Sequence, residues 1–219
     1  INIYMYIYYN IYIYMIYFII TTSIFNNCDI RKNQYIKGIN KLKKIIQDLN
    51  FENYKIIVVE NNGKRDTILN MLDCEVYYTE NNLKKTANKG LKELHDILDC
   101  IDKYKINDTD FIVKMTGRYI LDDDSEFMNI IKNIHNTNYD CVIKYGPYFK
   151  PVNYRMNDCI TGLIGMSCLY VKQIEKPNER ECVEWNWGKV TKLIDEKKIY
   201  LVNRLGINIC PGSNEYFKV

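Results

Sequence analysis

From residue 15 onward, short hydrophobic runs alternate with longer segments whose hydrophobic residues recur every three or four positions. The runs lie in MIYFIITTSI (15–24), YKIIVVENNG (54–63), CEVYYTENN (74–82), DFIVKM (110–115) and DCVIKYG (140–146). The segments with helical spacing are 34–50, 65–72 and 84–104. Runs without polar alternation are typical of strands that are buried on both faces. The sequence therefore predicts an α/β fold with a mostly parallel sheet and helices on both faces.

After residue 147 the alternation of predicted strands and helices continues, but it is less regular. Residues 148–158 predict a loop, ITGLIGMS (160–167) a strand, and the segments 122–134 and 181–198 a helix each. No internal repeat and no linker interrupt the chain, and 219 residues suit one domain with a substantial core. We therefore expect a single domain over residues 15–219.

Residues 1–14 are an alternation of Ile and Tyr that differs from the rest of the chain. The first 20 residues carry no charge, and a segment of this length can span a membrane as a helix. However, tyrosine prefers the membrane interface, and no basic segment precedes the run. We interpret residues 1–14 as a low-complexity leader outside the fold, with Met15 as a natural start, and expect a cytoplasmic protein. Membrane anchoring through residues 1–20 is the alternative.

The composition argues against several classes of function. A formal net charge of +3 is too small to indicate nucleic-acid binding. The eight cysteines are scattered without a C-x-x-C pair, which suits buried, reduced thiols rather than a disulfide framework. The two histidines, His95 and His135, stand alone, so no zinc site is expected.

Polar residues gather where the predicted strands end. The ends carry Thr21, Thr22 and Ser23, then Glu60, Asn61 and Asn62, then residues 79–82, and finally residues 114–118 with Lys114, Thr116 and Arg118. In open α/β sheets, ligands bind outside the carboxyl ends of the strands. A glycine-rich dinucleotide fingerprint and a P-loop are both missing, so a nucleotide would need a different cradle.

The order of these features resembles the GT-A fold of nucleotide-sugar glycosyltransferases, a Rossmann-type fold. The resemblance covers roughly residues 15 to 212. It implies that Thr21 and Thr22 touch the base or ribose, and that Glu60 and Asn61 lie near the base. An N-x-G-type element, Asn88, Lys89 and Gly90, would open the long helix. The segment KMTGRY (114–119) is also similar to a K-x-T-G-R-Y signature of small glycosyltransferase-like proteins from bacteria and large DNA viruses. The implied reaction moves a sugar from a nucleotide-diphosphate sugar to a glycan or another hydroxyl acceptor.

The chain departs from the resembled family at the metal-binding D-x-D. The fourth strand ends in Lys114 and Arg118, and the aspartates come several residues later. In one reading, Asp122 and Asp124 hold Mn²⁺ or Mg²⁺. In the reading that we prefer, Lys114 and Arg118 bind the diphosphate without a metal, and the aspartates begin a helix. In a third, the two cations pair with nearby carboxylates such as Asp110 or Asp122.

An inverting transfer also requires a base, which in the resembled enzymes lies late in the chain at the start of a helix. Glu184 fits this description, and Trp185 and Trp187 beside it could stack on a sugar ring. A solvated glutamate at a helix start is an equally simple reading, and a retaining transfer would not need this base.

Two other functions remain open. A sugar-nucleotidyltransferase should carry a glycine-rich, arginine-containing loop after the first strand, which TTSIFNNCDIRKN lacks. A non-catalytic nucleotide-sugar-binding relic of the fold would explain the missing D-x-D.

Overall fold

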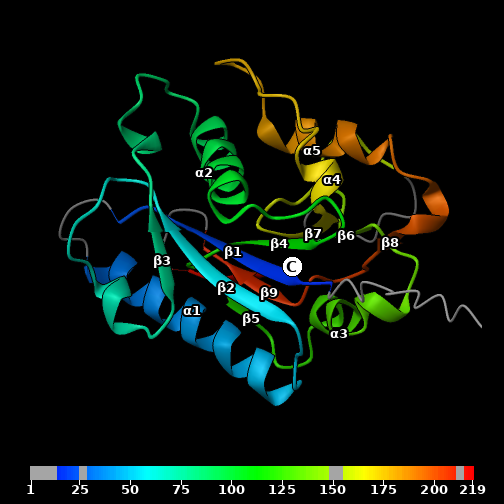
Figure 1. Cartoon of the computed structure of the whole chain (residues 1–219), viewed down its shortest axis with the longest axis horizontal. Coiled ribbons are helices and arrows are strands. Elements are labelled where there is room, and N and C mark those ends of the chain that lie inside the picture. The colour runs from blue at the N-terminus through cyan, green and yellow to red at the C-terminus, as the bar shows by residue number, and fades with distance from the viewer. Residues whose placement is uncertain (1–13, 25–28, 148–154, 211–214) are drawn as a thin grey trace, which may run out of the picture.

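The central element of the fold is a seven-stranded sheet in the order β3-β2-β1-β4-β7-β6-β8 (Figure 1). The computed structural model describes residues 14–24, 29–147, 155–210 and 215–219. The strands are β1 (Ile16–Thr22), β2 (Tyr54–Glu60), β3 (Glu75–Tyr78), β4 (Phe111–Thr116), β6 (Cys141–Ile143), β7 (Leu163–Ser167) and β8 (Ile199–Leu201). Only β7 runs antiparallel to its neighbours within this sheet. The predicted mostly parallel sheet is confirmed.

Helices cover both faces of the sheet, as Figure 1 shows. One face carries α1 (Asp29–Asp48) and α3 (Glu126–Lys132), and the other carries α2 (Lys89–Tyr104), α4 (Cys168–Val171) and α5 (Val183–Thr191). Side chains of β1 alternate between the two layers: Phe18 and Ile20 join the core under α1, and Ile19 joins the core under α2. A strand with helices on both sides must be apolar at every position, which explains the uninterrupted hydrophobic run.

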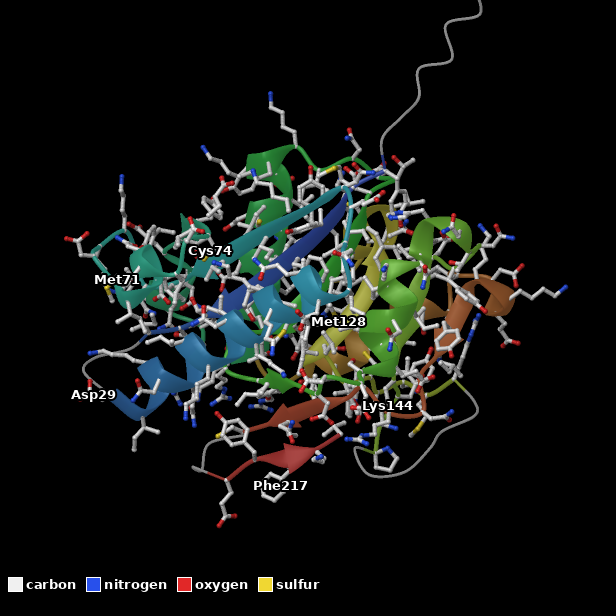
Figure 2. The ribbon with its side chains drawn as sticks, turned by 90° about the horizontal axis from the view of Figure 1, so that it is seen from below. Asp29, Met71, Cys74, Met128, Lys144 and Phe217 are labelled. Atoms are coloured by element: carbon white, nitrogen blue, oxygen red, sulfur yellow. The ribbon has the colours of Figure 1, made fainter. Side chains whose placement is uncertain are left out.

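A second, antiparallel sheet has the order β10-β9-β5 and lies on the α1 side. Its strands are β5 (Ile120–Leu121), β9 (Ile207–Ile209) and β10 (Phe217–Lys218). Figure 2, which looks from below, shows Phe217 on the outer strand of this sheet, and β5 at the opposite edge contacts α1. Helix α1 passes so close to the turn before β5 that a Cβ on Gly38 would lie 2.2 Å from the Gly117 carbonyl oxygen. Only glycine allows this approach, which holds residues 117–119 in place.

Several predicted helices differ in their bounds. Helix α1 begins at Asp29, five residues before the predicted start, and residues 65–72 form only a 3-10 turn, η1 (Ile68–Met71). Helix α2 begins at Lys89 because the Asn88 side chain caps it. Helix α3 begins at Glu126, since the Ser125 hydroxyl accepts a hydrogen bond from the Met128 amide. The remaining short elements are η2 (Asn81–Leu83), η3 (Ile134–Asn136) and η4 (Glu196–Lys198).

Other sequence predictions concern the termini, membranes, cysteines and metals. The proposed leader falls almost wholly outside the described residues, as does most of the predicted loop 148–158. No helix in the described part of the chain is long and apolar enough to cross a membrane. Of the seven described cysteines, five are buried. In the described part of the chain, no three His, Cys, Asp or Glu side chains lie close enough together to hold a metal ion.

Candidate functional site

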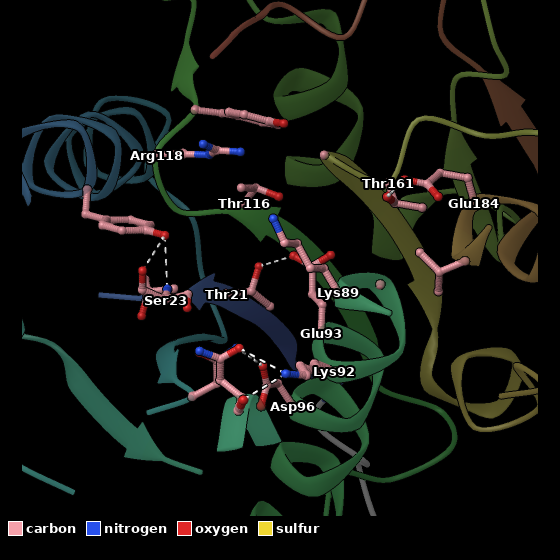
Figure 3. Close-up of a pocket in the computed structure, with 18 of the residues that line it drawn as sticks. Thr21, Ser23, Lys89, Lys92, Glu93, Asp96, Thr116, Arg118, Thr161 and Glu184 are labelled. Carbon is pink, nitrogen blue, oxygen red and sulfur yellow. Dashed lines mark hydrogen bonds between the residues drawn. The ribbon is translucent and has the colours of Figure 1, made fainter. Parts of the chain in front are cut away.

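A cavity of about 580 Å³ opens at the carboxyl ends of β1 and β4, between α2, α5 and the turn at residues 117–119 (Figure 3). Its lining consists of Thr21, Thr22, Ser23, Arg31, Tyr35, Asn61, Asn82, Lys89, Gly90, Lys92, Glu93, Asp96, Thr116, Arg118, Tyr119, Ile160, Thr161, Gly162, Val183 and Glu184. This is the edge at which open α/β sheets bind ligands. The structure therefore brings together most of the strand-end residues predicted from the sequence.

One face of α2 forms a wall of the cavity. It presents Lys89, Lys92, Glu93 and Asp96. Their spacing of three, one and three residues places them on one side of a helix, in line with the cavity. Of these four residues, only Lys89 was predicted from the sequence, through the resemblance of residues 88–90 to an N-x-G-type element. The same spacing, searched for in polar residues, would have found the others.

Four cations line the cavity: Arg31, Lys89, Lys92 and Arg118. None of them forms an ion pair with a carboxylate of the described residues. Lys92 donates to the backbone oxygen of Asn82 at 2.8 Å, and the Arg118 guanidinium lies 5.7 Å from the centre of the Tyr119 ring. Figure 3 shows Arg118, Thr116 and Lys89 around one space. A cation that is partly removed from water is stabilised by an anion, so this space suits a negatively charged ligand.

Lys114 does not line the cavity, although it was predicted to bind the diphosphate. Its side chain is 1% exposed, and its ammonium lies 2.9 Å from Glu93 Oε1. It also donates to the Thr161 carbonyl oxygen at 2.6 Å and to Thr116 Oγ1 at 3.1 Å. The protein itself thus supplies the anion that Lys114 requires.

The partner of Lys114 is Glu93, which was not predicted from the sequence. Its Oε1 atom accepts from Thr21 Oγ1 at 2.5 Å as well as from Lys114. The predicted local partners of Lys114, Asp110 and Asp122, are wrong for this lysine. The true partner comes from a helix 21 residues earlier, which only the crossover of the fold brings close.

Glu60 is fully buried and does not line the cavity. Its carboxylate accepts four hydrogen bonds, from Thr22 Oγ1 (2.9 Å), the Ile24 amide (2.9 Å), Asn62 Nδ2 (2.6 Å) and Arg65 Nη2 (3.0 Å). These contacts fasten the segments that follow β1 and β2. In this structure, Glu60 therefore shapes the cavity edge rather than facing a base, while its neighbour Asn61 does line the cavity.

Asp96 sits behind Asn61 and was not found from the sequence. It accepts from Asn61 Nδ2 at 2.9 Å, Thr79 Oγ1 at 2.6 Å and Asn81 Nδ2 at 2.8 Å. Burial raises the pKa of the Asp96 carboxyl to about 6, although the three donors oppose that shift. Asp96 joins the ends of two strands to α2 and holds Asn61 in the cavity wall.

The Asn88–Lys89–Gly90 element contributes mainly to helix packing. The Asn88 amide oxygen accepts from the Leu91 amide at 3.1 Å, and its Nδ2 atom donates to the carbonyl oxygens of Asn178 (2.8 Å) and Glu181 (2.9 Å). A Cβ on Gly90 would lie 2.5 Å from Val183 Cγ1, so glycine lets α2 approach α5. Asn88 stays out of the cavity lining, whereas Lys89 and Gly90 belong to it.

Glu184 lies in the first turn of α5 and faces the cavity, where it was predicted. Its Oε1 atom is 3.4 Å from Thr161 Oγ1, and its Oε2 atom accepts from Cys182 Sγ at 2.7 Å. The tryptophans beside it do not line this cavity: Trp187 is buried in the core, and Trp185 is half-exposed in another hollow. Neither indole can therefore stack on a ligand inside this cavity.

The aspartates predicted to hold a metal lie outside the cavity. Asp122 pairs with Arg204 and accepts from Asn208 Nδ2 at 2.6 Å, which ties the end of β5 to β9. Asp124 is exposed in the turn before α3, so the aspartates precede that helix rather than begin it. The structure does not place Asp122 and Asp124 beside the other predicted site residues.

No protein-family model and no curated protein sequence matches the chain. Solved structures show that it has the α/β, GT-A-like fold shared by nucleotidyltransferases and glycosyltransferases. Identities of 8–10% establish this fold and nothing finer.

Three such structures illustrate the likeness. A protein from Bacillus anthracis assigned as a glucose-1-phosphate thymidylyltransferase, in complex with a sucrose, has a TM-score of 0.53 and 10% identity, covering 85% of this chain and 86% of that one. A 4-diphosphocytidyl-2C-methyl-D-erythritol synthase has a TM-score of 0.53 and 9% identity, covering 88% and 91%. A mannosyltransferase from Pyrobaculum calidifontis, in complex with GDP-mannose and Mn²⁺, has a TM-score of 0.50 and 8% identity, covering 85% of this chain and 54% of that one.

Proposed function

We propose that this chain is a glycosyltransferase that moves a sugar from a nucleotide-diphosphate sugar to an acceptor hydroxyl. The observation that carries the proposal is the cavity at the carboxyl edge of the sheet. There, four cations without an ion pair among the described residues face the same space as the carboxylate of Glu184. Cations suit a diphosphate, and a carboxylate across from them suits the activation of a hydroxyl. The fold shared with nucleotide-sugar enzymes supports this assignment.

Arg118 is the proposed principal contact to the diphosphate. A guanidinium can donate two parallel hydrogen bonds to phosphate oxygens, and Lys89 adds a second positive charge nearby. Thr21, Thr22 and Asn61 would then lie toward the nucleoside, at the ends of β1 and β2.

A divalent metal ion, as in the mannosyltransferase complex, fits these residues poorly. Of the carboxylates that line the cavity, Glu93 is paired with Lys114 and Asp96 already accepts three hydrogen bonds. Glu184 alone would be a weak ligand set for Mn²⁺ or Mg²⁺, which need several oxygen ligands. We therefore assign the neutralisation of the departing nucleoside diphosphate to Arg118 and Lys89.

In the proposed reaction, the acceptor hydroxyl attacks the anomeric carbon of the donor while Glu184 takes its proton. The bond from that carbon to the diphosphate oxygen breaks, and the nucleoside diphosphate leaves with the electron pair. Glu184→Gln keeps the size of the side chain but cannot accept the proton, so turnover should fall by about two to four orders of magnitude. The KM for the donor should stay the same, because the base faces the acceptor.

Glu181→Gln is the matched control for this variant. Glu181 lies one residue before the α5 cap and is paired with Lys189 at 2.7 Å, outside the cavity. Its substitution should change turnover little. Normal turnover by Glu184→Gln would contradict the assignment of the base and point to retention of configuration or to another base.

Arg118→Ala should weaken nucleotide-sugar binding by about one to two orders of magnitude, the typical effect of losing charge-assisted hydrogen bonds. Its melting temperature should not change, since no described carboxylate pairs with Arg118. Isothermal titration measures the affinity, and Arg204→Ala, which removes a half-exposed arginine outside the cavity, is the control. Unchanged affinity together with a lower melting temperature would make Arg118 a structural residue.

The class of reaction is tested by the products. A nucleotide sugar with a panel of acceptors should yield free nucleoside diphosphate. A nucleoside triphosphate with a sugar 1-phosphate should yield no pyrophosphate, because the segment between β1 and α1 contains no glycine-rich loop. Release of pyrophosphate would favour a sugar-nucleotidyltransferase. Binding without any product would favour a non-catalytic relic of the fold.

A further inference from the structure

A second cavity, of about 620 Å³, lies on the other side of α5. It is lined by Arg155, Met156, Asn157, Asp158, Trp185, Lys189 and Lys192. Its volume falls within the range of roughly 300–1,000 Å³ that is usual for small-molecule sites. The proposed donor site uses none of these residues.

Helix α5 presents different residues to the two cavities. Trp185, Lys189 and Lys192 follow each other at intervals of four and three residues, so they form one stripe along the helix. Glu184 is rotated by about 100° from Trp185 and faces the first cavity. The α5 helix is therefore a wall shared by both cavities.

The two cavities are close to each other at Asp158. The segment before β7 packs so tightly on α5 that a Cβ on Gly188 would lie 2.5 Å from the Asn157 carbonyl oxygen. Burial and the neighbouring charge of Glu184 raise the pKa of the Asp158 carboxyl. Cys159 Sγ also donates to the Glu184 carbonyl oxygen at 3.1 Å, so Asp158 lies between a residue that contacts Gly188 and a residue that contacts Glu184, at the turn of α5 that the two cavities share.

The exposed indole is the unusual feature of the second cavity. Trp185 is 50% exposed, whereas Trp187 is 2% exposed in the core. An aromatic face surrounded by amide, carboxylate and ammonium groups can pack on the C–H face of a pyranose and hydrogen-bond its hydroxyls. Asn157, Asp158 and Lys192 supply such groups.

The charges around the cavity favour a ligand without net charge. Lys189 is paired with Glu181 at 2.7 Å, and Arg155 lies 3.6 Å from Glu196. The remaining lining charges are those of Lys192 and Asp158, which are opposite in sign. Lys192 donates to Asn157 Oδ1 at 2.5 Å and has no carboxylate partner among the described residues, but Glu181, Glu196 and Asp158 balance the three cations of the lining, so a uronic acid or a sugar phosphate gains no net attraction.

We propose that the second cavity is the acceptor subsite and binds an uncharged pyranose of a glycan on the face of Trp185. The sugar's reacting hydroxyl would extend past Asp158 to Glu184. The placement of that hydroxyl rests on the proposed function, whereas the binding of the saccharide does not.

Tryptophan fluorescence tests the binding directly. The chain has two tryptophans, and only Trp185 is exposed among them, so its emission reports on the second cavity. The probes are methyl α- and β-glycosides of glucose, galactose and mannose, with the corresponding uronic acids as charged counterparts. We expect a saturable change in emission with at least one uncharged glycoside, and a weaker effect of its uronic acid.

Isothermal titration with the same glycoside gives the affinities of the variants. Trp185→Ala should raise the dissociation constant about tenfold, the expected effect of losing one aromatic contact surface. Arg204→Ala, a change outside this cavity, should not alter it. The proposal is overturned if no uncharged glycoside binds, if only the uronic acids bind, or if Trp185→Ala binds as tightly as the unchanged chain.

Kinetics separate this proposal from the proposed function. If transfer is observed, Trp185→Ala should raise the KM for the acceptor about tenfold and leave the KM for the nucleotide sugar unchanged. Saccharide binding without turnover would leave the subsite standing while the transferase assignment fails. Turnover whose acceptor KM does not respond to Trp185→Ala would remove the subsite and leave the transferase assignment in place.

Discussion

Replacing Glu93 by glutamine should destabilise the protein strongly, although Glu93 itself is 27% exposed. The reason is Lys114, whose side chain is 1% exposed and whose ammonium lies 2.9 Å from the Glu93 carboxylate. Breaking a buried ion pair by removing one partner costs about 3–5 kcal/mol, because the other charge stays buried. Since Glu93 is partly solvated and Lys114 keeps two neutral acceptors, we expect about 2–3 kcal/mol.

A double variant tests whether the charge is the cause. In Glu93→Gln with Lys114→Met, neither charge remains, and methionine has an unbranched chain that fills similar space. Its free energy of unfolding should return to within about 1 kcal/mol of the original chain, the residual loss coming from the Thr161 carbonyl, which loses its donor. Urea denaturation at equilibrium, followed by circular dichroism, measures Glu93→Gln, Lys114→Met and the double variant.

Two outcomes would contradict this reasoning. A Glu93→Gln variant within about 0.5 kcal/mol of the original would mean that Lys114 does not depend on this carboxylate. A double variant less stable than either single one would mean that packing, not charge, determines the loss. The double variant also tests the sequence prediction for Lys114: unchanged nucleotide-sugar affinity would exclude it as a diphosphate contact.

The remaining predictions concern α2. Gly90→Ala should cost about 1–3 kcal/mol by forcing α2 away from α5, and Val183→Ala in the same chain should restore part of the loss, as melting temperatures would show. The raised pKa of Asp96 means that the folded chain holds a proton that the unfolded chain has lost. Stability should therefore fall, by up to about 3 kcal/mol, as the pH rises from about 4 through about 6. Asp96→Asn should lose this dependence in urea denaturation at pH 4 to 8, whereas an unchanged profile would assign it to another group.

The sheet could be predicted from the sequence because its strands are buried on both faces. Such strands are continuous hydrophobic runs, and each of the five predicted from residue 15 to 146 overlaps an observed strand. The carboxyl edge followed from the same pattern and predicted Arg118 as a site residue, whereas Glu184 was predicted from the resemblance to glycosyltransferases. The 3-10 turn at η1 could not, since eight residues with helical spacing do not determine whether a full helix forms.

The roles of individual residues were harder to predict than the sheet, because the same types of side chain bind ligands and form internal contacts. Lys114, Glu60 and Asp122 each lie within two residues of the carboxyl end of a strand, as ligand-binding residues do. The structure gives all three internal partners: Glu93, four donors around Glu60, and Arg204. These partners come from distant segments, so spacing along the chain carries no information about them.

The internal pairing also determines the charge of the cavity. If the Glu93 carboxylate were unpaired, it would attract Lys89, which lies four residues earlier on the same helix, and cancel its charge. Lys114 prevents this pairing, because its buried ammonium neutralises the Glu93 carboxylate and is itself not part of the cavity lining. The lysines of α2 and Arg118 then remain without a described carboxylate partner and keep their positive charge in the cavity. A buried lysine that binds no ligand can thus preserve an anion site formed by other residues, and this is why the double variant should retain nucleotide-sugar binding while Arg118→Ala should not.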